Sequence, residues 1–169
     1  TGDLDHFLPK SVFQLYALSV WNLIPTCKLC NQTFKGSRFI PLLNPLEAGF
    51  DADCFLNVEF HSLGQLLGKD NNFDVSWELD PFISADTREK IENNIQMFRL
   101  NEVYQYHKEE LRLVLKRRQM LSSRRYVEEV KKLVGEEDLD EILLGIPEKP
   151  ENLDKRILAK AKYDVVKRN

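Results

Sequence analysis

The stretch Leu4-Asp-His-Phe-Leu-Pro-Lys-Ser11 decides how the first part of the chain is interpreted, because it places an acid and an imidazole inside a short apolar run. Leu4–Leu8 predicts a brief strand, which the following proline ends because it cannot donate to a strand ladder. Trp21–Pro25 predicts a second short strand. Asp5 is a hard oxygen ligand, and His6 can accept a proton near neutral pH. Neighbouring side chains on a strand point to opposite faces, so the two share a site only where the backbone bends.

The composition is that of a folded chain. Of the 169 residues, 43% are apolar and 30% are charged, with seven Gly and seven Pro; these values favour a packed core over disordered or low-complexity classes. The net charge of −3 excludes a uniformly basic nucleic-acid coat protein. No apolar run approaches the roughly 18 residues of a membrane helix, and no signal peptide is visible. We therefore expect a cytoplasmic protein with no membrane partner.

The three cysteines form an odd set that contains one Cys-x-x-Cys pair, Cys27 and Cys30. This pattern disfavours a disulfide-rich secreted scaffold and favours thiols that are free for metal. A structural Zn²⁺ takes four ligands, so the pair supplies half of a zinc site. We expect the remaining ligands to lie upstream of Thr1. We expect Cys54 to be a small buried hydrophobe rather than a third ligand.

The remainder of the chain changes from irregular to helical. Apolar residues between 55 and 60 and between 75 and 79 predict two short strands around a Gly/Asn-rich loop. From residue 86 onward the apolar spacing is helical. The predicted helices begin at Asp86 and at Asn101 and cover 126–133, 139–144 and 152–167. The predicted fold class is α+β, and we expect three segments: residues 1–45, 46–85 and 86–169.

A basic stripe runs through the helical part. Residues 112–132 hold eight Lys or Arg against two Glu, and a local stripe indicates a polyanion better than the overall charge does. Arg117-Arg118 and Arg124-Arg125 are two helical turns apart, so they face one way if the helix is continuous. A solvated helix face explains the run equally well. We expect Trp21 and Trp77 to anchor the core rather than to stack on bases.

Several motifs of the first forty residues occur in a specific order: Asp5-His6-x-x-Pro9-x-Ser11, then Asn22-Leu23, then Cys27-x-x-Cys30-Asn31. His6, Asn22 and Asn31 are 16 and then 9 residues apart. Over roughly residues 3–36 this order resembles the HNH, or ββα-metal, endonuclease superfamily. A looser likeness at Leu100–Glu102 and Leu158–Tyr163 is similar to bacterial phage-defence nucleases of the Septu and retron-associated kind.

The resemblance implies a small ββα-metal nuclease module followed by a mainly helical region. His6 would be the general base, and Asn22 would hold the His-bearing loop through backbone hydrogen bonds. Asp5 and Asn31 would bind Mg²⁺ or Mn²⁺. Lys35 matches the family's trailing Lys, one residue later than the commonest spacing. The candidate nucleic-acid ligands are the following cations: Lys10, Lys35, Arg117, Arg118, Arg124 and Arg125.

The implied activity is metal-dependent hydrolysis of DNA, expected to be double-stranded, by an effector of a bacterial anti-phage defence system. An ATPase or another defence subunit is the expected protein partner. Two alternatives stay open. In one, the chain is a non-catalytic interaction subunit of a larger complex. In the other, it is an HNH nuclease that cuts RNA, such as tRNA.

Overall fold

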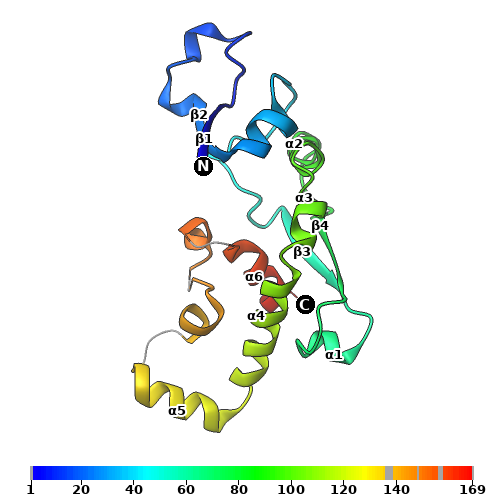
Figure 1. Cartoon of the computed structure of the whole chain (residues 1–169), viewed down its shortest axis with the longest axis vertical. Helices are drawn as coiled ribbons and strands as arrows, with labels where there is room; N and C mark the ends of the chain where they lie inside the picture. The colour runs from blue at the N-terminus through cyan, green and yellow to red at the C-terminus, as the bar shows by residue number, and fades with distance from the viewer. Residues whose placement is uncertain (1, 136–138, 148, 156–157, 169) are drawn as a thin grey trace. The chain divides into compact units, whose positions relative to one another are not determined.

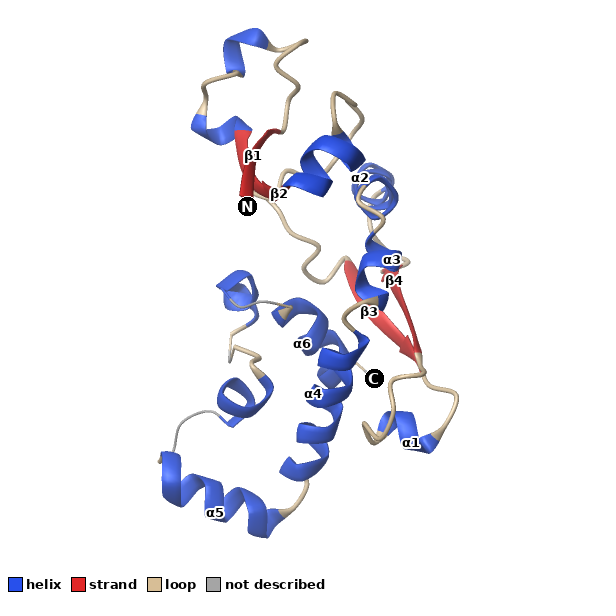
Figure 2. Ribbon diagram, in the orientation of Figure 1, coloured by secondary structure: helices blue, strands red, loops and turns tan. Residues whose placement is uncertain are grey.

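The computed structural model describes residues 2–135, 139–147, 149–155 and 158–168. The fold is α+β: two small antiparallel hairpins are followed by a mainly helical C-terminal region (Figures 1 and 2). The chain forms two compact units. Unit 1 comprises Thr1–Cys54 with Leu79–Glu102, and unit 2 comprises Phe55–Glu78 with Val103–Asn169. The expected divisions after residues 45 and 85 both fall inside unit 1.

The first hairpin pairs β1 (Gly2–His6) with β2 (Leu23–Cys27), and it places His6 opposite Leu23. Strand β1 begins and ends two residues before the predicted segment Leu4–Leu8. Strand β2 begins and ends two residues after the predicted segment Trp21–Pro25. The cause is Leu8, whose backbone N–H and C=O both bond to the side chain of Asn22 instead of joining the strand ladder. The wide loop between the strands contains two short 3₁₀ turns, η1 (Gln14–Tyr16) and η2 (Val20–Asn22) (Figure 1).

A π-helical turn, η3 (Leu29–Lys35), follows the hairpin and packs against both of its strands. The turn ends at Gly36, which has φ +56° and donates its N–H to the carbonyl of Asn31 at 2.7 Å. Glycine adopts this left-handed conformation without the steric penalty that a Cβ would add. The residue type at position 36 therefore determines where the turn stops.

Unit 1 is completed by α2 (Ala85–Met97) and the start of α3 (Leu100–Gln105). The predicted start of α2 at Asp86 is correct to within one residue, because Ser84 caps the helix by accepting a hydrogen bond from Thr87 N–H. The predicted cap Asn101 instead lies inside α3.

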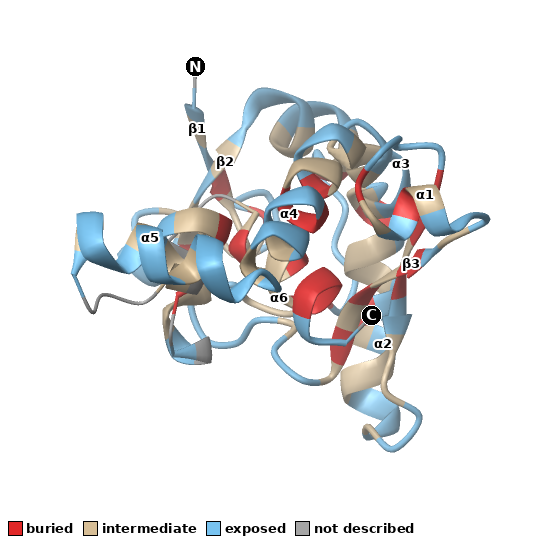
Figure 3. Ribbon diagram, turned by 90° about the horizontal axis from the view of Figure 1, so that it is seen from below, coloured by how far each residue is buried: buried red, intermediate tan, exposed pale blue. Residues whose placement is uncertain are grey.

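Unit 2 contains the second hairpin, β3 (Cys54–Glu59) with β4 (Asp74–Leu79), and a single helical turn, α1 (Leu63–Leu66). Helix α4 (Lys108–Leu121) packs against α6 (Ala159–Lys167), and Figure 3 shows the buried residues that α6 contributes. One apolar cluster of this unit consists of Val114, Leu144, Ile146 and Val166.

The helix is not continuous between the two Arg pairs, so the condition for their facing one way is not met. Helix α4 ends at Leu121, and α5 (Arg124–Val134) starts anew with Ser123, whose hydroxyl accepts a hydrogen bond from Tyr126 N–H. Serine competes for backbone hydrogen bonds, so it is favoured at a helix start and disfavoured inside a helix. The predicted helix 126–133 lies within α5, which is capped at its C-terminus by Gly135.

The last part of the chain forms η4 (Asp140–Leu144), η5 (Pro150–Lys155) and α6. The predicted helix 152–167 includes residues 156–157, which lie outside the described residues. Within the described part of the chain, no helix has both the length and the apolar character needed to cross a membrane.

Asp164 connects α6 to strand β3, and substitution of this residue tests how much the contact contributes to stability. It is fully buried, and its Oδ2 accepts the N–H of Leu56 at 2.9 Å and the ammonium of Lys160 at 2.6 Å. Asp164→Ala leaves a buried donor without an acceptor, so we expect the free energy of unfolding to fall by about 1–3 kcal/mol. Urea unfolding, followed through Trp77 fluorescence in a Trp21→Phe background, measures this loss.

Asp164→Asn is the matched control, because an amide oxygen can still accept the Leu56 N–H. A loss with Asn as large as the loss with Ala would show that the charge, and not the hydrogen bond to β3, stabilises this contact.

Candidate active site

A cleft of about 390 Å³ lies in unit 1, beside the end of β1. It brings together residues from three separate parts of the sequence: the end of β1, the loop that follows it, and the turn η3 with Gly36. Of the candidate residues, Asp5, His6, Lys10 and Asn31 all line it. The complete lining is Leu4, Asp5, His6, Pro9, Lys10, Ser11, Asn31, Gly36 and Ser37.

The imidazole of His6 is oriented by the loop between the strands. Its Nε2 lies 3.0 Å from the carbonyl oxygen of Ala17. A carbonyl can only accept, so this hydrogen bond assigns the proton of the neutral ring to Nε2. The lone pair is then on Nδ1. A neutral imidazole with a free ring nitrogen in a cleft is suited to accept a proton from water.

Asn22 is buried and ties the two ends of the same loop together. Its Oδ1 accepts the N–H of Leu8 at 2.6 Å, and its Nδ2 donates to the carbonyls of Leu8 and Tyr16, both at 3.1 Å. The backbone carbonyl of Asn22 also accepts the N–H of Phe7. The side chain thus bonds to the backbone of the His-bearing loop at two points, Leu8 and Tyr16.

Lys35 does not lie on the surface. It is 2% exposed, and its Nζ donates to Asp5 Oδ1 at 3.0 Å and to the carbonyl of His6 at 2.6 Å. A lysine is almost never fully buried unless it is paired. The expectation that Lys35 contacts phosphate does not fit this position; the ammonium instead fixes the end of β1 against η3.

Asn31 is oriented by a residue that the sequence argument missed. Its Nδ2 donates to Oδ2 of Asp3 at 3.3 Å, and Gln32 Nε2 donates to the same oxygen at 3.1 Å. Asp3 and Asp5 are two residues apart on a strand, so alternation alone places them on one face. The alternation of side chains along the strand could therefore have identified Asp3 as a residue on the same face as Asp5.

The oxygens in this cleft fit a hard divalent cation. Oδ1 of Asp5 accepts a hydrogen bond from Lys35. Within the described residues, neither Oδ2 of Asp5 nor Oδ1 of Asn31 has a hydrogen-bond partner. Mg²⁺ typically takes one or two protein oxygens and keeps several waters, so one carboxylate and one amide suit it. No cluster of three or more His, Cys, Asp or Glu that could hold a metal occurs among the residues that the structure describes.

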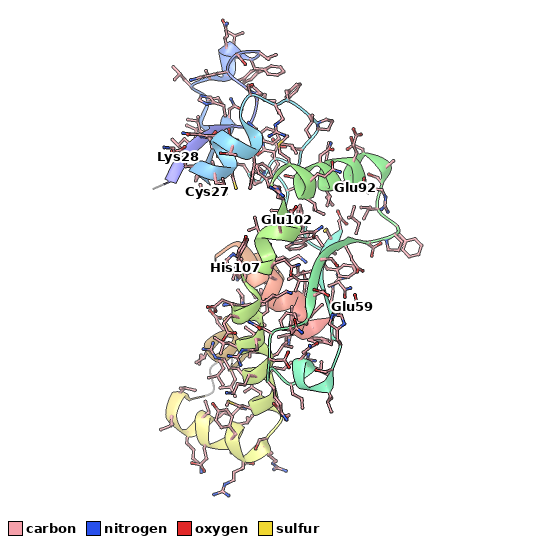
Figure 4. All side chains as sticks on the ribbon, turned by 45° about the vertical axis from the view of Figure 1, so that its right-hand side comes forward. Cys27, Lys28, Glu59, Glu92, Glu102 and His107 are labelled. Atoms are coloured by element: carbon pink, nitrogen blue, oxygen red, sulfur yellow. The ribbon has the colours of Figure 1, made fainter. Side chains whose placement is uncertain are left out.

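The Cys-x-x-Cys pair lies where β2 leads into η3, and Figure 4 labels Cys27, the first of its two cysteines. Cys27 is exposed and free, and its Sγ accepts the N–H of Cys30 at 3.3 Å. That backbone hydrogen bond lowers the pKa of Cys27. Burial, followed by its contact with Cys27, raises the pKa of Cys30 to about 11. The pair supplies two thiol ligands, so the half zinc site stays a prediction. Cys54 is buried, as expected.

Two further expectations concern residues outside this cleft. Trp77 is buried, but the prediction that Trp21 anchors the core is wrong, since Trp21 is 77% exposed. The four candidate arginines Arg117, Arg118, Arg124 and Arg125 belong to unit 2. Arg117 donates to the carbonyl of Leu143, and Arg124 pairs with Glu128 at 2.9 Å. Their role as nucleic-acid ligands stays a prediction.

Comparisons of this chain with family models, with curated proteins and with solved structures give no match.

The pKa difference within the pair predicts the order in which the cysteines react. The thiolate is the nucleophile, so alkylation follows ionisation. Because the pKa of Cys27 is lowered and that of Cys30 is raised to about 11, iodoacetamide should modify Cys27 at the lower pH. Initial rates, measured by mass spectrometry across a pH series, test this order.

Buried Cys54 is the internal control and should stay unmodified while the protein is folded. Equal initial rates for Cys27 and Cys30 at every pH would contradict the assigned hydrogen bond between them.

Proposed function

We propose that this chain is a metal-dependent HNH endonuclease that hydrolyses phosphodiester bonds of DNA. One observation carries the proposal: Asp5, His6 and Asn31 line a single cleft, although Asn31 is 25 or more residues away from the other two in sequence. The order of β1, β2 and η3, with η3 packed on both strands, supports it, because the ββα-metal resemblance implies this order.

In this proposal each residue has a separate task. Nδ1 of His6 takes the proton from the attacking water, while the Nε2–H bond to Ala17 keeps the ring aimed. Asp5 and Asn31 hold the cation through their oxygens. Bound Mg²⁺ or Mn²⁺ supplies charge neutralisation at the scissile phosphate and at the leaving 3′ oxygen. Lys10, which lines the cleft, would contact a neighbouring phosphate.

The biological setting belongs to the same proposal. The resemblance implies an effector of anti-phage defence that works with an ATPase or another defence subunit. Cleavage assays with and without such a subunit test this setting. Metal-assisted hydrolysis tolerates either sugar, so DNA and RNA should be assayed side by side.

His6→Ala removes the proposed general base and is the first test of this function. Because general-base catalysis contributes about 100-fold to 10,000-fold, we expect cleavage to fall at least about 100-fold. A gel assay of DNA cleavage measures the rate, and circular dichroism checks that the variant is folded.

His61→Ala is the matched control, because His61 is an exposed imidazole of unit 2 that pairs with Asp74. Full activity in His6→Ala would remove His6 from the mechanism. Cleavage that persists in excess chelator would remove the metal.

Lys35→Met tests the cation site without measuring activity. The substitution keeps the length of the side chain but leaves Asp5 as an uncompensated buried carboxylate, so we expect a loss of about 3–5 kcal/mol in stability. A cation on the free oxygen of Asp5 would compensate for the missing ammonium. Millimolar Mg²⁺ should therefore raise the Tm of Lys35→Met more than the Tm of the wild type.

Adding Asp5→Asn to Lys35→Met removes the charge that attracts Mg²⁺, so the extra shift in Tm should disappear. An equal shift in all three proteins would place Mg²⁺ binding away from Asp5.

A further inference from the structure

The loop that orients His6 also exposes large apolar side chains. Leu15 is 98% exposed, Leu18 is 93% exposed, and Val20 and Trp21 are each 77% exposed. Single exposed apolar residues are ordinary on a protein surface, but a run of them within one short loop marks an interaction site.

Hydrogen bonds hold this exposed loop in one shape. Asn22 bonds to Leu8 and Tyr16, and His6 bonds to Ala17. Within the loop, the carbonyl of Pro9 accepts from two backbone N–H groups, and the turns η1 and η2 close further bonds. The apolar side chains are therefore presented to solvent on an ordered backbone, which lowers the entropy lost when a ligand binds.

The charged residues within the loop and the segment after it are all positive. From Phe7 to Leu46 the sequence contains four Lys or Arg and no Asp or Glu. Lys10, Lys28 and Arg38 are exposed, whereas Lys35 is buried on Asp5. The carboxylates just before this segment, Asp3 and Asp5, accept hydrogen bonds from side chains of η3. An exposed apolar surface that carries cations is complementary to a polyanion.

Aromatic side chains accompany these cations. Trp21, Tyr16 and Phe39 are each more than half exposed. Phe39 packs edge-to-face on Phe13 of the loop, with the ring centroids 5.0 Å apart. Proteins that bind single-stranded nucleic acid combine cations for the backbone with aromatic faces for the bases. Paired bases do not offer their faces to such side chains, so this combination favours unpaired strands over a duplex.

We propose that the loop Phe7–Asn22 binds unpaired nucleobases, with Trp21 as a stacking residue, so that the substrate is single-stranded DNA or an unpaired stretch within a duplex. The inference rests on the proposed function, because it names the substrate class of the same cleft. Lys10 and Ser11 belong to the loop and also line the cleft. A strand bound along the loop therefore continues directly to His6.

Fluorescence anisotropy of the full chain tests the inference. The probes are a fluorescein-labelled, mixed-sequence single strand of DNA and its fully paired duplex, both in EDTA so that no cleavage occurs. We expect the single strand to bind more tightly than the duplex. Trp21→Ala should weaken single-strand binding by about 5-fold to 100-fold, the effect of losing one stacked base. Trp21→Phe keeps an aromatic face and should retain most of the affinity.

Phe82→Ala is the matched control within unit 1. Phe82 is 93% exposed, but it lies between Asp80 and Asp86, so it should contribute nothing to binding a polyanion. Equal binding of the two probes, or equal effects of Trp21→Ala and Phe82→Ala, would overturn the inference. Because the Trp21 side chain is exposed, neither outcome can be attributed to misfolding once unfolding curves of the variants match the wild type.

The alternative occupant of the loop is a second copy of the chain. Light scattering of wild type and of Leu15→Ser tests it: a dimer that Leu15→Ser dissociates, with DNA binding unchanged, would overturn the inference. The anisotropy assay involves no hydrolysis, so its result is separate from the activity of His6→Ala. A failure of the single-strand inference is therefore distinguishable from a failure of the proposed function.

Discussion

A single buried ammonium group holds the candidate active site together. Nζ of Lys35 donates hydrogen bonds to the carboxylate of Asp5 and to the carbonyl of His6, and the side chains of Lys35 and Asp5 are 2% and 11% exposed. Unit 1 has few buried apolar side chains, and in the described residues these are Pro9, Leu42, Cys54, Ile91 and Met97. With so small an apolar core, polar contacts must fix the geometry, and a buried charge is tolerated only with its partner in place.

This contact constrains more than one residue. Lys35 ends η3 and Asp5 lies in β1, so their ion pair fixes the turn against the hairpin. Asn31 lies about one turn before Lys35 in η3, and the same packing brings its amide to the cleft. Asp3 then sets the rotation of that amide. The two oxygen donors proposed for the metal ion are thus placed by contacts with other protein groups.

The order of motifs drew attention to Asp5, His6 and Asn31, which line one cleft, because each motif lies in or next to a strand of one hairpin. The role of Lys35 was not predictable, because its partner is 30 residues away and lysine is usually exposed. Trp21 was placed in the core on residue type alone, which does not report whether neighbouring segments cover a side chain. The break between α4 and α5 could have been predicted from the paired serines at 122 and 123.

The loop between β1 and β2 carries two tasks that would otherwise need separate elements. Its inner side supplies the carbonyl of Ala17 that sets the His6 tautomer, and its outer side presents Leu15, Leu18 and Trp21. Asn22 joins the two ends, so neither side can shift alone. A ligand that moves the outer side must also move the Ala17 carbonyl, and with it the imidazole. If both proposals hold, binding at the loop and proton transfer at His6 would be coupled through a single backbone segment, without contact between the ligand and the imidazole.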